Sequence, residues 1–383
     1  MVYLLKLGEL TLKGENRGEF EKVLQHNLKM LLAGITAKIS VTNGRYFVDV
    51  PEACAEQAEN AFSRLFGITG WALTRVCEKT VNAMLIACIE EARVLAGKGV
   101  KTFKIEARRT DKSFPLDSYG IMANAGQSVL ENVPALTVNV KTPSSVINVE
   151  IREKVYVYSN SVKGLRGLPV GVAGRGLLLL SGGIDSPVAG FLMAGRGVSI
   201  DAVHFHAYPF TSNEAQQKVA KLAEILGRYT LGVCLHVVGF TDIQMRIKER
   251  APLPWSTVLL RMAMMRAAEN IAAQCRARCL ITGESLSQVA SQTAENIACT
   301  QSVVAMPILR PLIGMDKEAI IHISEKIGAY KTSILPYKDC CTLFSPKHPV
   351  LRGDIKEALS LFEKLDINSL IEQSIKERVI YRL

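Results

Sequence analysis

The 383-residue sequence has few aromatic residues, 6% of the total, and no apolar run long enough to span a lipid bilayer. Residues 1–9 lack a basic stretch followed by an apolar run and a cleavage site, which excludes a secretory signal peptide. Hydrophobic residues still make up 48% of the chain. We therefore expect a soluble, cytoplasmic α/β protein, long enough for two or three domains.

Cysteines are present, but no Cys-x-x-Cys pair occurs among the nine. An odd number without regular spacing argues against a disulfide framework, so we expect reduced thiols. Cys275 and Cys279 are four residues apart on a predicted helix, and nothing near them in the sequence completes a zinc site. Cys340 and Cys341 are different, because three basic residues surround them and favour a reactive thiol, namely Lys338, Lys347 and His348.

Residues 177–187 read Leu-Leu-Leu-Leu-Ser-Gly-Gly-Ile-Asp-Ser-Pro, which predicts a buried strand, a sharp turn and a helix. We expect Ser186 to cap this helix and Pro187 to occupy its first position. Backbone N–H groups and the helix dipole make such a turn an anion site, and the expected anion is a nucleotide phosphate chain. No lysine follows the glycines, which excludes a Walker loop, and the dinucleotide spacing Gly-x-Gly-x-x-Gly is also absent.

The six residues 181–186, Ser-Gly-Gly-Ile-Asp-Ser, resemble the PP-loop of the ATP pyrophosphatases. That family cleaves ATP between the α and β phosphates and adenylates its substrate. Asp185 would lie beside the phosphates, where a carboxylate serves as a Mg²⁺ ligand. The hydroxyls of Ser181 and Ser186 would donate hydrogen bonds to phosphate oxygens. The alternative is an ordinary strand-to-helix turn with a capping serine.

The chain before this loop divides into segments of different pattern. Residues 1–56 predict a small α+β module with a strand, a helix and a hairpin around Asn43-Gly44, at 3–7, 16–32 and 38–50. Residues 57–162 predict helices at 59–66, 81–95 and 118–133 and strands at 102–107, 135–140, 146–151 and 155–159. Residues 163–175 contain four glycines and a proline, which is typical of a linker.

From Gly176 onward strands and helices alternate, which predicts a parallel sheet with crossover helices. The expected strands are 177–180, 200–205, 231–238 and 278–282, and the expected helices are 187–195, 213–226, 241–250, 256–275 and 317–327. Ligands of such sheets bind at the carboxyl ends of the strands. This rule brings His204-Phe205 and the segments 283–285 and 291–293 to the glycine loop.

The formal net charge is +10, which favours a polyanionic partner. Segment 101–112 places five basic residues around one strand, and we expect them to contact RNA phosphates: Lys101, Lys104, Arg108, Arg109 and Lys112. A second basic run contains Arg152, Lys154, Lys163, Arg166 and Arg175. The alternative for such residues is a solvated strand edge.

The order of these parts resembles one family along essentially the whole chain. Residues 3–17 resemble the N-terminal ferredoxin-like domain of the ThiI family, the tRNA 4-thiouridine synthetases, and the middle segment looks like its RNA-binding THUMP domain. The linker, the PP-loop and the motifs at 310–317 and 339–342 are similar to those of the same family. The resemblance implies a ferredoxin-like domain at 1–56, a THUMP domain at 57–162, a linker at 163–175 and a PP-loop ATP pyrophosphatase domain at 176–383.

The resemblance also implies a two-step reaction on tRNA. ATP adenylates the C4 oxygen of the uridine at position 8, and a persulfide then delivers sulfur to C4. The sulfur would come from a cysteine desulfurase such as IscS, and family members also pass sulfur to the carrier ThiS for the thiamine thiazole. The longest members carry a C-terminal rhodanese domain, whereas this sequence ends about 40 residues after Cys341. We therefore expect a form without the rhodanese domain, for which the role in thiamine synthesis stays open. A homodimer is also possible from the sequence.

Site residues follow from the same resemblance. Cys340, Asp185 and Lys317 are the implied catalytic residues, with Asp185 holding Mg²⁺ through ATP and Lys317 stabilising charge on phosphate. The implied ATP contacts are Leu179, Leu180, Ser181, Gly182, Gly183, Asp185, Ser186, His204, Phe205, Arg261, Gly283 and Gln292. The residues themselves support Arg261, because a charge in an otherwise apolar helix needs an anionic partner, unless the side chain reaches solvent.

Two other functions remain compatible with the sequence. One is a different PP-loop adenylase, as in lysidine or GMP synthesis, which would not depend on Cys340. The other is an RNA-binding protein that uses a nucleotide as a structural ligand, which would bind ATP without releasing pyrophosphate.

Overall fold

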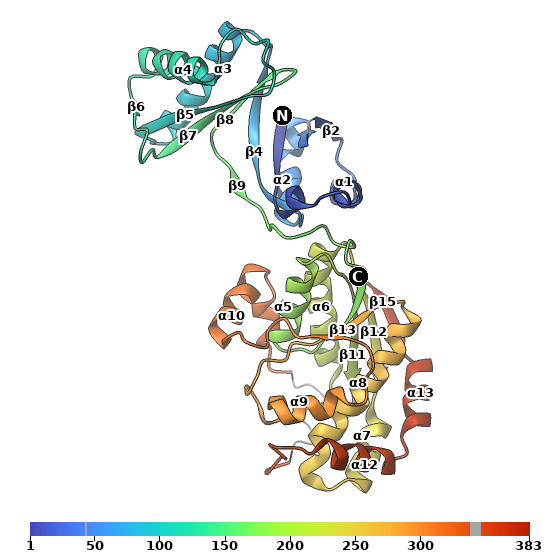
Figure 1. The fold of residues 1–383 in the computed structure, drawn as a ribbon. Coiled ribbons are helices and arrows are strands. Elements are labelled where there is room, and N and C mark those ends of the chain that lie inside the picture. Colours follow the sequence, from blue (N-terminus) through green and yellow to red (C-terminus); the bar gives the residue numbers. More distant parts are fainter. Residues whose placement is uncertain (43, 338–345) are drawn as a thin grey trace. The chain divides into compact units, whose positions relative to one another are not determined.

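The computed structural model describes residues 1–42, 44–337 and 346–383. Asn43 of the expected hairpin turn and both Cys340 and Cys341 therefore lie outside the described residues. The chain divides into two units, one formed by Met1–Gly14 and Leu28–Arg166 and the other by Glu15–Asn27 and Gly167–Leu383 (Figure 1). Within the described ranges, no helix has the length and apolar character needed to cross a membrane.

The described residues of the first unit form a nine-stranded sheet in the order β2-β3-β1-β4-β8-β7-β5-β6, with β9 paired to β4. Its strands are β1 (Val2–Leu7), β2 (Lys38–Thr42), β3 (Arg45–Asp49), β4 (Ile68–Cys77), β5 (Thr102–Arg109), β6 (Thr137–Val138), β7 (Ser145–Ile151), β8 (Val155–Tyr158) and β9 (Val162–Lys163). Its helices are α2 (Ala55–Ser63), α3 (Val81–Gly97) and α4 (Ser118–Asn132), while α1 (Arg17–Leu31) has residues in both units. Most expected elements occur, but the expected strand at 135–140 shrinks to β6.

Strand β4 is the main element of this unit that the sequence did not predict. It pairs antiparallel with β1, where Val2 lies opposite Thr74, and with β8, where Arg75 lies opposite Val157. Ile68, Gly70, Ala72 and Thr74 are buried on one face, whereas on the other face Trp71 is buried and Leu73 is exposed. Gly70 allows close approach of the Val162 carbonyl of β9, which a Cβ atom would obstruct. β4 thus joins segments that the sequence assigned to two separate domains.

The second unit contains a six-stranded sheet among its described residues, in the order β14-β13-β10-β11-β12-β15. Its strands are β10 (Arg175–Leu179), β11 (Ser199–His206), β12 (Cys234–Gly239), β13 (Cys279–Ile281), β14 (Ile308–Leu309) and β15 (Val379–Arg382). Its helices are α5 (Asp185–Ala194), α6 (Asn213–Thr230), α7 (Thr241–Arg250), α8 (Ser256–Gln274), α9 (Ala294–Gln301), α10 (Lys317–Lys326), α11 (Tyr330–Ser333), α12 (Ile355–Lys364) and α13 (Asn368–Lys376). The predicted parallel sheet is confirmed, and among the strands that the structure describes here only β15 runs antiparallel, along β12.

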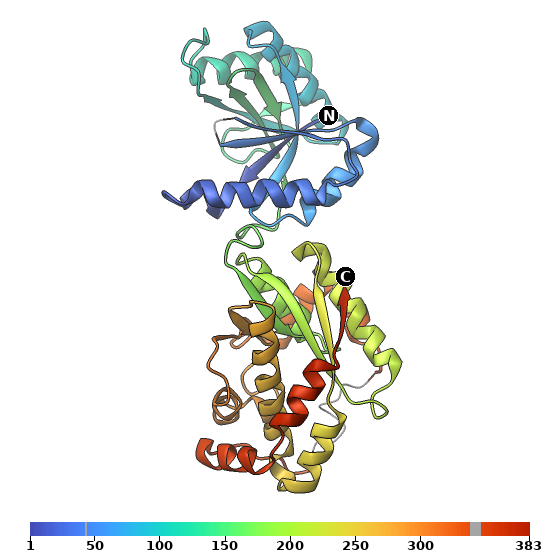
Figure 2. The same cartoon turned by 90° about the vertical axis from the view of Figure 1, so that its right-hand side faces the viewer.

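Helices cover both faces of this sheet (Figure 2). On one face α5 lies directly against β10 and α6, since a Cβ at Gly190 would stand 2.8 Å from side-chain atoms of both Leu178 and Leu226. On the other face, the buried side chains of the central strands form one core with α8 and α13. The strand expected at 231–238 begins later, because α6 extends to Thr230 and ends at Leu231 in the left-handed conformation.

Cys275 and Cys279 do not share a helix, which corrects the prediction. Cys275 follows the last residue of α8, whereas Cys279 begins β13. The fold instead places Cys275 beside His236 of β12, with Sγ and Nε2 3.3 Å apart. Nε of Arg378 donates to Nδ1 of His236 at 3.2 Å. Because a guanidinium only donates, Nε2 must carry the proton of the neutral imidazole and faces the sulfur, which leaves no lone pair there for a metal ion.

Burial of His236, reinforced by the Arg378 charge, lowers the pKa of its imidazole from 6.5 to about 4. Asp201, which completes this cluster, is paired with Arg175 at 3.2 Å. Since the unfolded state takes up the proton at higher pH than the folded state, stability is full above pH 6.5 and falls as the pH drops toward 4. The loss is up to roughly 3 kcal/mol.

We therefore expect His236→Gln to flatten the decline of the unfolding free energy between pH 6.5 and 4, measured by urea denaturation at several pH values. His322→Gln, at an exposed position of α10, serves as the control and should keep the decline. An unchanged slope in His236→Gln would refute this role of the buried imidazole.

Candidate functional site

The glycine loop connects β10 to α5 and is closed by its two serines. Ser181 donates its backbone N–H to Oγ of Ser186 at 2.9 Å, and the two hydroxyl oxygens lie 3.1 Å apart. Helix α5 already begins at Asp185, without a side-chain cap, so the expected capping by Ser186 is wrong. The hydroxyl bonds across the loop instead of to the helix. Pro187 is the third residue of α5, not the first as expected, but it still lies in the first turn, where its missing N–H is harmless.

A cleft with a volume of about 180 Å³ opens at the carboxyl ends of the strands, beside this loop. It gathers ten of the twelve residues predicted to contact ATP: Leu179, Leu180, Ser181, Asp185, Ser186, His204, Phe205, Arg261, Gly283 and Gln292. The other two, Gly182 and Gly183, belong to the loop but do not line the cleft. The structure thus brings these residues together, while their contacts with ATP remain a prediction.

His204 is buried at the end of β11, and its Nδ1 lies 3.1 Å from the carbonyl oxygen of Leu180. A carbonyl oxygen only accepts hydrogen bonds, so Nδ1 carries the proton and donates it. Leu180 itself donates its N–H to Val203 of the neighbouring strand at 2.8 Å. The imidazole is therefore fixed in one orientation by the first residue after β10.

The sequence predicted an anionic partner for Arg261, and the structure shows that this partner is a side chain of the protein itself. Its guanidinium bonds to the carboxylate of Glu284, whose other oxygen accepts from Nε of Arg310 at 2.7 Å. Oγ of Thr282 also donates to Glu284, at 2.9 Å. Burial alone raises the pKa of Glu284, yet the two guanidinium groups outweigh it and hold the pKa below its usual value. The carboxylate therefore remains charged.

Two arginines around one carboxylate leave an excess positive charge at the cleft. Nε of Arg261 and Nη2 of Arg310 are buried and have no hydrogen-bond partner among the described residues. Burial of an unsatisfied donor is costly, the more so on a charged group. An anionic ligand in the cleft would therefore be stabilised by the guanidinium group of Arg261, which lines the cleft, and by the charge of Arg310 behind Glu284.

Asp185 and Lys317, both predicted to be catalytic, are in contact. Nζ of Lys317 lies 2.5 Å from one carboxylate oxygen of Asp185, and Nε2 of Gln288 donates to the other at 2.9 Å. Lys317 is the first residue of α10, where the helix dipole disfavours a cation. Its pairing with Asp185 offsets this disadvantage and positions the ammonium group beside the glycine loop.

Gly283 lies directly after β13 and Thr282, against the first turn of α5. A Cβ at this position would stand 2.7 Å from the backbone N of Ser186 and 2.9 Å from the carbonyl carbon of Asp185. Since both are backbone atoms, a side chain would force the two segments apart. Only glycine permits this close approach, which supports the prediction that position 283 belongs to the site.

We expect Gly283→Ala to lower the unfolding free energy by about 1–3 kcal/mol and to weaken ATP binding at least about tenfold. Denaturant unfolding and titration calorimetry measure the two effects. Gly314→Ala is the matched control, because no atom lies within 4 Å of a Cβ at that glycine. ATP binding at the original affinity in Gly283→Ala would contradict the close-approach argument.

The five residues predicted to contact RNA lie on and after β5 in the first unit. Lys101, Arg108 and Lys112 are exposed, whereas Lys104 pairs with Glu106 at 2.8 Å. Nη1 of Arg109 donates to the carbonyls of Phe114 and Leu116, each at 3.2 Å, and so holds the loop after the strand. In the second basic run, Arg152 is buried and pairs with Glu150 at 3.0 Å, so a phosphate cannot reach it.

Sequence reasoning missed three polar groups as site residues: Glu284, which lines the cleft, and Arg310 and Gln288, which bond to the cleft residues Glu284 and Asp185. Arg310 follows β14 and Glu284 follows β13, so both stand at the carboxyl ends of strands. That position was a usable signal for Glu284, which the sequence already placed near the loop. Strand β14 has only two residues and was not predicted, so the strand pattern gave no signal for Arg310. The family motif at 310–317, which begins with this residue, was the signal that could have found it.

Three family profiles match the chain. The description "ThiI ferredoxin-like domain" matches residues 2–72, "THUMP domain" matches 85–160, and "Thiamine biosynthesis protein (ThiI)" matches 171–367. They occur in the order expected from the sequence, so the predicted fold class is confirmed.

Curated relatives match over nearly their full length. One from Treponema pallidum (strain Nichols), named "Probable tRNA sulfurtransferase", is 50% identical and covers 98% of this chain and 94% of its own. One from Caldanaerobacter subterraneus subsp. tengcongensis, with the same name, is 44% identical over 99% of both chains. A solved structure described as "Crystal structure of a 4-thiouridine synthetase - RNA complex with bound ATP" is 34% identical with a TM-score of 0.93, covering 100% of this chain and 99% of its own.

Proposed function

Because the chain belongs to the ThiI family and is a tRNA sulfurtransferase, we propose that it forms 4-thiouridine at position 8 of tRNA in an ATP-dependent reaction. The observation that carries this proposal is the cleft, where ten residues predicted to contact ATP converge beside the loop 181–186. The 34% identity over the whole chain to a 4-thiouridine synthetase solved with RNA and ATP supports it. We further propose the domain division inferred above, with RNA contacts from the basic residues of segment 101–112.

In the first step of the proposed reaction, the C4 oxygen of uridine bonds to the α-phosphorus of ATP and pyrophosphate leaves. The serine hydroxyls and backbone N–H groups of the loop would hold the phosphates. The two guanidinium groups around Glu284 would supply fixed positive charge as negative charge develops, which requires no reorganisation during the reaction. Leu179, Leu180 and Phe205 would flank the adenine.

The residues present fit a magnesium ion. Asp185 already accepts a cation, the Lys317 ammonium, at a carboxylate whose side chain is 20% exposed. Hard oxygen ligands of this kind are those Mg²⁺ prefers, together with substrate phosphates. When bound, Mg²⁺ would neutralise phosphate charge, and Asp185 would hold it while Lys317 faces the phosphates.

In the second step, Cys340 would carry a persulfide supplied by a cysteine desulfurase. The outer sulfur bonds to C4 and AMP leaves with the former C4 oxygen, which gives a disulfide between tRNA and Cys340. A second thiol, assigned here to Cys341, attacks the sulfur of Cys340. This releases 4-thiouridine and leaves a Cys340–Cys341 disulfide, which an external thiol reduces before the next turnover.

A role in sulfur transfer to ThiS is a second proposal. It rests on the description of the matching family as a thiamine biosynthesis protein. Thiolation of the ThiS C-terminus by the purified protein, ATP and desulfurase, followed by mass spectrometry, tests it. Absence of the mass increase, with tRNA thiolation intact, would restrict the protein to tRNA.

The proposed function is tested with unmodified tRNA, ATP, Mg²⁺, a cysteine desulfurase, cysteine and a reducing thiol. We expect pyrophosphate release that depends on tRNA, together with near-UV absorbance of 4-thiouridine in the tRNA. ATP binding without pyrophosphate would favour the RNA-binding alternative. Pyrophosphate release with incorporation of an amine in place of sulfur would favour another PP-loop adenylase.

A further inference from the structure

The segment 284–292 borders the cleft and reaches the glycine loop. Both of its ends, Glu284 and Gln292, line the cleft. Between them, Nε2 of Gln288 donates to a carboxylate oxygen of Asp185 at 2.9 Å. Asp185 belongs to the loop 181–186 and also lines the cleft. Gln288 therefore lies beside the place where the proposed reaction brings the uridine to the α-phosphate of ATP.

Backbone hydrogen bonds fix this segment next to Gln288. The N–H of Leu286 donates to the carbonyl oxygen of Ile313 at 3.0 Å, and the N–H of Ser287 donates to that of Gln292 at 2.9 Å. Ser287 has a φ of 61°, in the left-handed region that few residues other than glycine occupy. Residues in such conformations cluster at functional sites. The backbone thus holds Gln288 in position before a substrate binds.

The contact with Asp185 determines which way the amide group of Gln288 points. A carboxylate only accepts hydrogen bonds, so the NH₂ group of the amide faces Asp185 and its carbonyl oxygen, Oε1, is left for another donor. The side chain is exposed, and within the described ranges Nε2 is its only hydrogen-bonded atom. Oε1 is therefore an accessible acceptor of fixed orientation at the edge of the cleft.

Uracil carries the matching donor next to its reacting atom. Its N3–H group is adjacent in the ring to C4, whose oxygen must reach the α-phosphorus of ATP. In cytosine the N3 atom has no hydrogen and is itself an acceptor. Enzymes that modify a base take it out of the stack and read its Watson–Crick edge by hydrogen bonds. An acceptor at this point therefore favours uridine over cytidine.

We propose that Gln288 selects the target base by accepting a hydrogen bond from uracil N3–H, an inference that rests on the proposed function. Leu286 and Val289 stand on either side of Gln288 in the sequence, and their side chains are 49% and 50% exposed. They supply an apolar surface on which the ring packs, as flipped bases do on apolar side chains. Gln288 is thus a specificity-determining residue, and it places the C4 oxygen toward the phosphates.

The test measures binding without turnover, because cytidine has no C4 oxygen to adenylate. tRNA with uridine, cytidine or 3-methyluridine at position 8 is titrated into the full-length chain with Mg²⁺ and α,β-methylene-ATP, which cannot release pyrophosphate. We expect the wild type to bind the cytidine and 3-methyluridine forms at least about tenfold more weakly than the uridine form. Gln288→Met should bind all three within about twofold. Comparing two proteins on the same RNAs cancels any effect of the base change on the tRNA itself.

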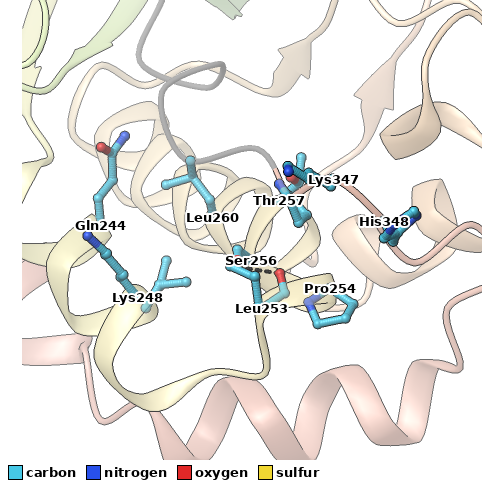
Figure 3. Close-up of a pocket in the computed structure, with 11 residues that line it drawn as sticks. Gln244, Lys248, Leu253, Pro254, Ser256, Thr257, Leu260, Lys347 and His348 are labelled. Atoms are coloured by element: carbon cyan, nitrogen blue, oxygen red, sulfur yellow. Dashed lines mark hydrogen bonds between the residues drawn. The ribbon is translucent and has the colours of Figure 1, made fainter.

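Matched controls are available for both parts of the site. Gln373→Met removes the same kind of amide, which donates to Glu377 at 2.9 Å on the exposed face of α13, and should keep the discrimination. Leu286→Ser should weaken all three forms alike, by about fivefold, because the ring loses packing while the acceptor stays. Its control is Leu253→Ser, which should bind as the wild type does. Leu253 is exposed at a separate cavity of about 520 Å³ between α7 and the start of α8, which shares no lining residue with the cleft (Figure 3).

The outcomes separate the proposal from its premise. Full discrimination in Gln288→Met would overturn the proposal, even if this variant bound ATP more weakly, because Gln288 would then only support Asp185. If the wild type discriminates between the bases but releases no pyrophosphate from ATP with tRNA, the proposed function fails while the base contact stands. If it releases pyrophosphate and binds all three forms alike, the proposed function stands and the base contact is refuted.

Discussion

Replacing Cys340 with serine is expected to lower 4-thiouridine formation at least about 1,000-fold, equivalent to roughly 4 kcal/mol of transition-state stabilisation. A hydroxyl cannot carry a transferable sulfur, so the second step fails. Pyrophosphate release in the first step needs only the cleft and should stay within about twofold of the wild type. Near-UV absorbance of the tRNA and a coupled pyrophosphate assay measure the two steps separately.

Two further thiols make this experiment specific. Cys54→Ser, at a half-buried position in the first unit, is the control and should leave both steps intact. In a single turnover without the reducing thiol, Cys341→Ser should still form the bond between sulfur and C4 but retain the tRNA on Cys340 as a disulfide. Dithiothreitol would then release thiolated tRNA from the trapped complex. Undiminished thiolation in Cys340→Ser would refute the role assigned to this cysteine.

Replacing Asp185 with asparagine is expected to reduce pyrophosphate release by about 1,000-fold or more, because the amide loses the charge that would hold Mg²⁺ at the phosphates. The same change also removes the partner of Lys317 at the mouth of the loop. This ion pair is partly exposed, with side-chain exposures of 42% for Lys317 and 20% for Asp185. Exposed pairs contribute little to stability, so the unfolding midpoint should hardly move.

The control for Asp185→Asn is Glu363→Gln, which removes one negative charge from an exposed position of α12. We expect it to keep full activity. A second variant, Lys317→Ala, should lower the rate of pyrophosphate release more than it raises KM for ATP, because the ammonium acts on developing charge. Asp185→Asn with the pyrophosphate release of the wild type would remove the basis of the PP-loop interpretation.

The cleft was largely predictable because its residues follow a general rule of parallel sheets. His204 and Gly283 stand at or just after the ends of strands, and the loop at 181–186 is local in sequence, so periodicity and spacing were enough to bring them together. For Arg261 the sequence predicted that the partner is anionic but not which residue it is. Glu284 is 23 residues away in the sequence, and nothing in that separation indicates that one carboxylate holds two arginines.

Predictions from local sequence patterns were wrong where an interaction with another part of the chain determined the structure. Ser186 has the side chain of a helix cap, but a hydrogen bond to Ser181 across the loop occupies its hydroxyl. Strand β4 escaped prediction because its buried face carries Gly70 and Thr74 while the apolar Leu73 lies exposed on the other face, so apolar and polar residues do not alternate along it. Cys279 lies on a strand because β13 pairs with β10, a long-range contact that a helical spacing cannot reveal.

Strand β4 has a mechanical consequence. Because its first half pairs with β1 and its last residues pair with β8, the ferredoxin-like and THUMP segments share one hydrogen-bonded backbone. Bending between them would break several backbone hydrogen bonds of the sheet at once, so these two segments should move as one rigid body. A proline within β4 would remove a donor of these hydrogen bonds and would weaken the connection between the two segments.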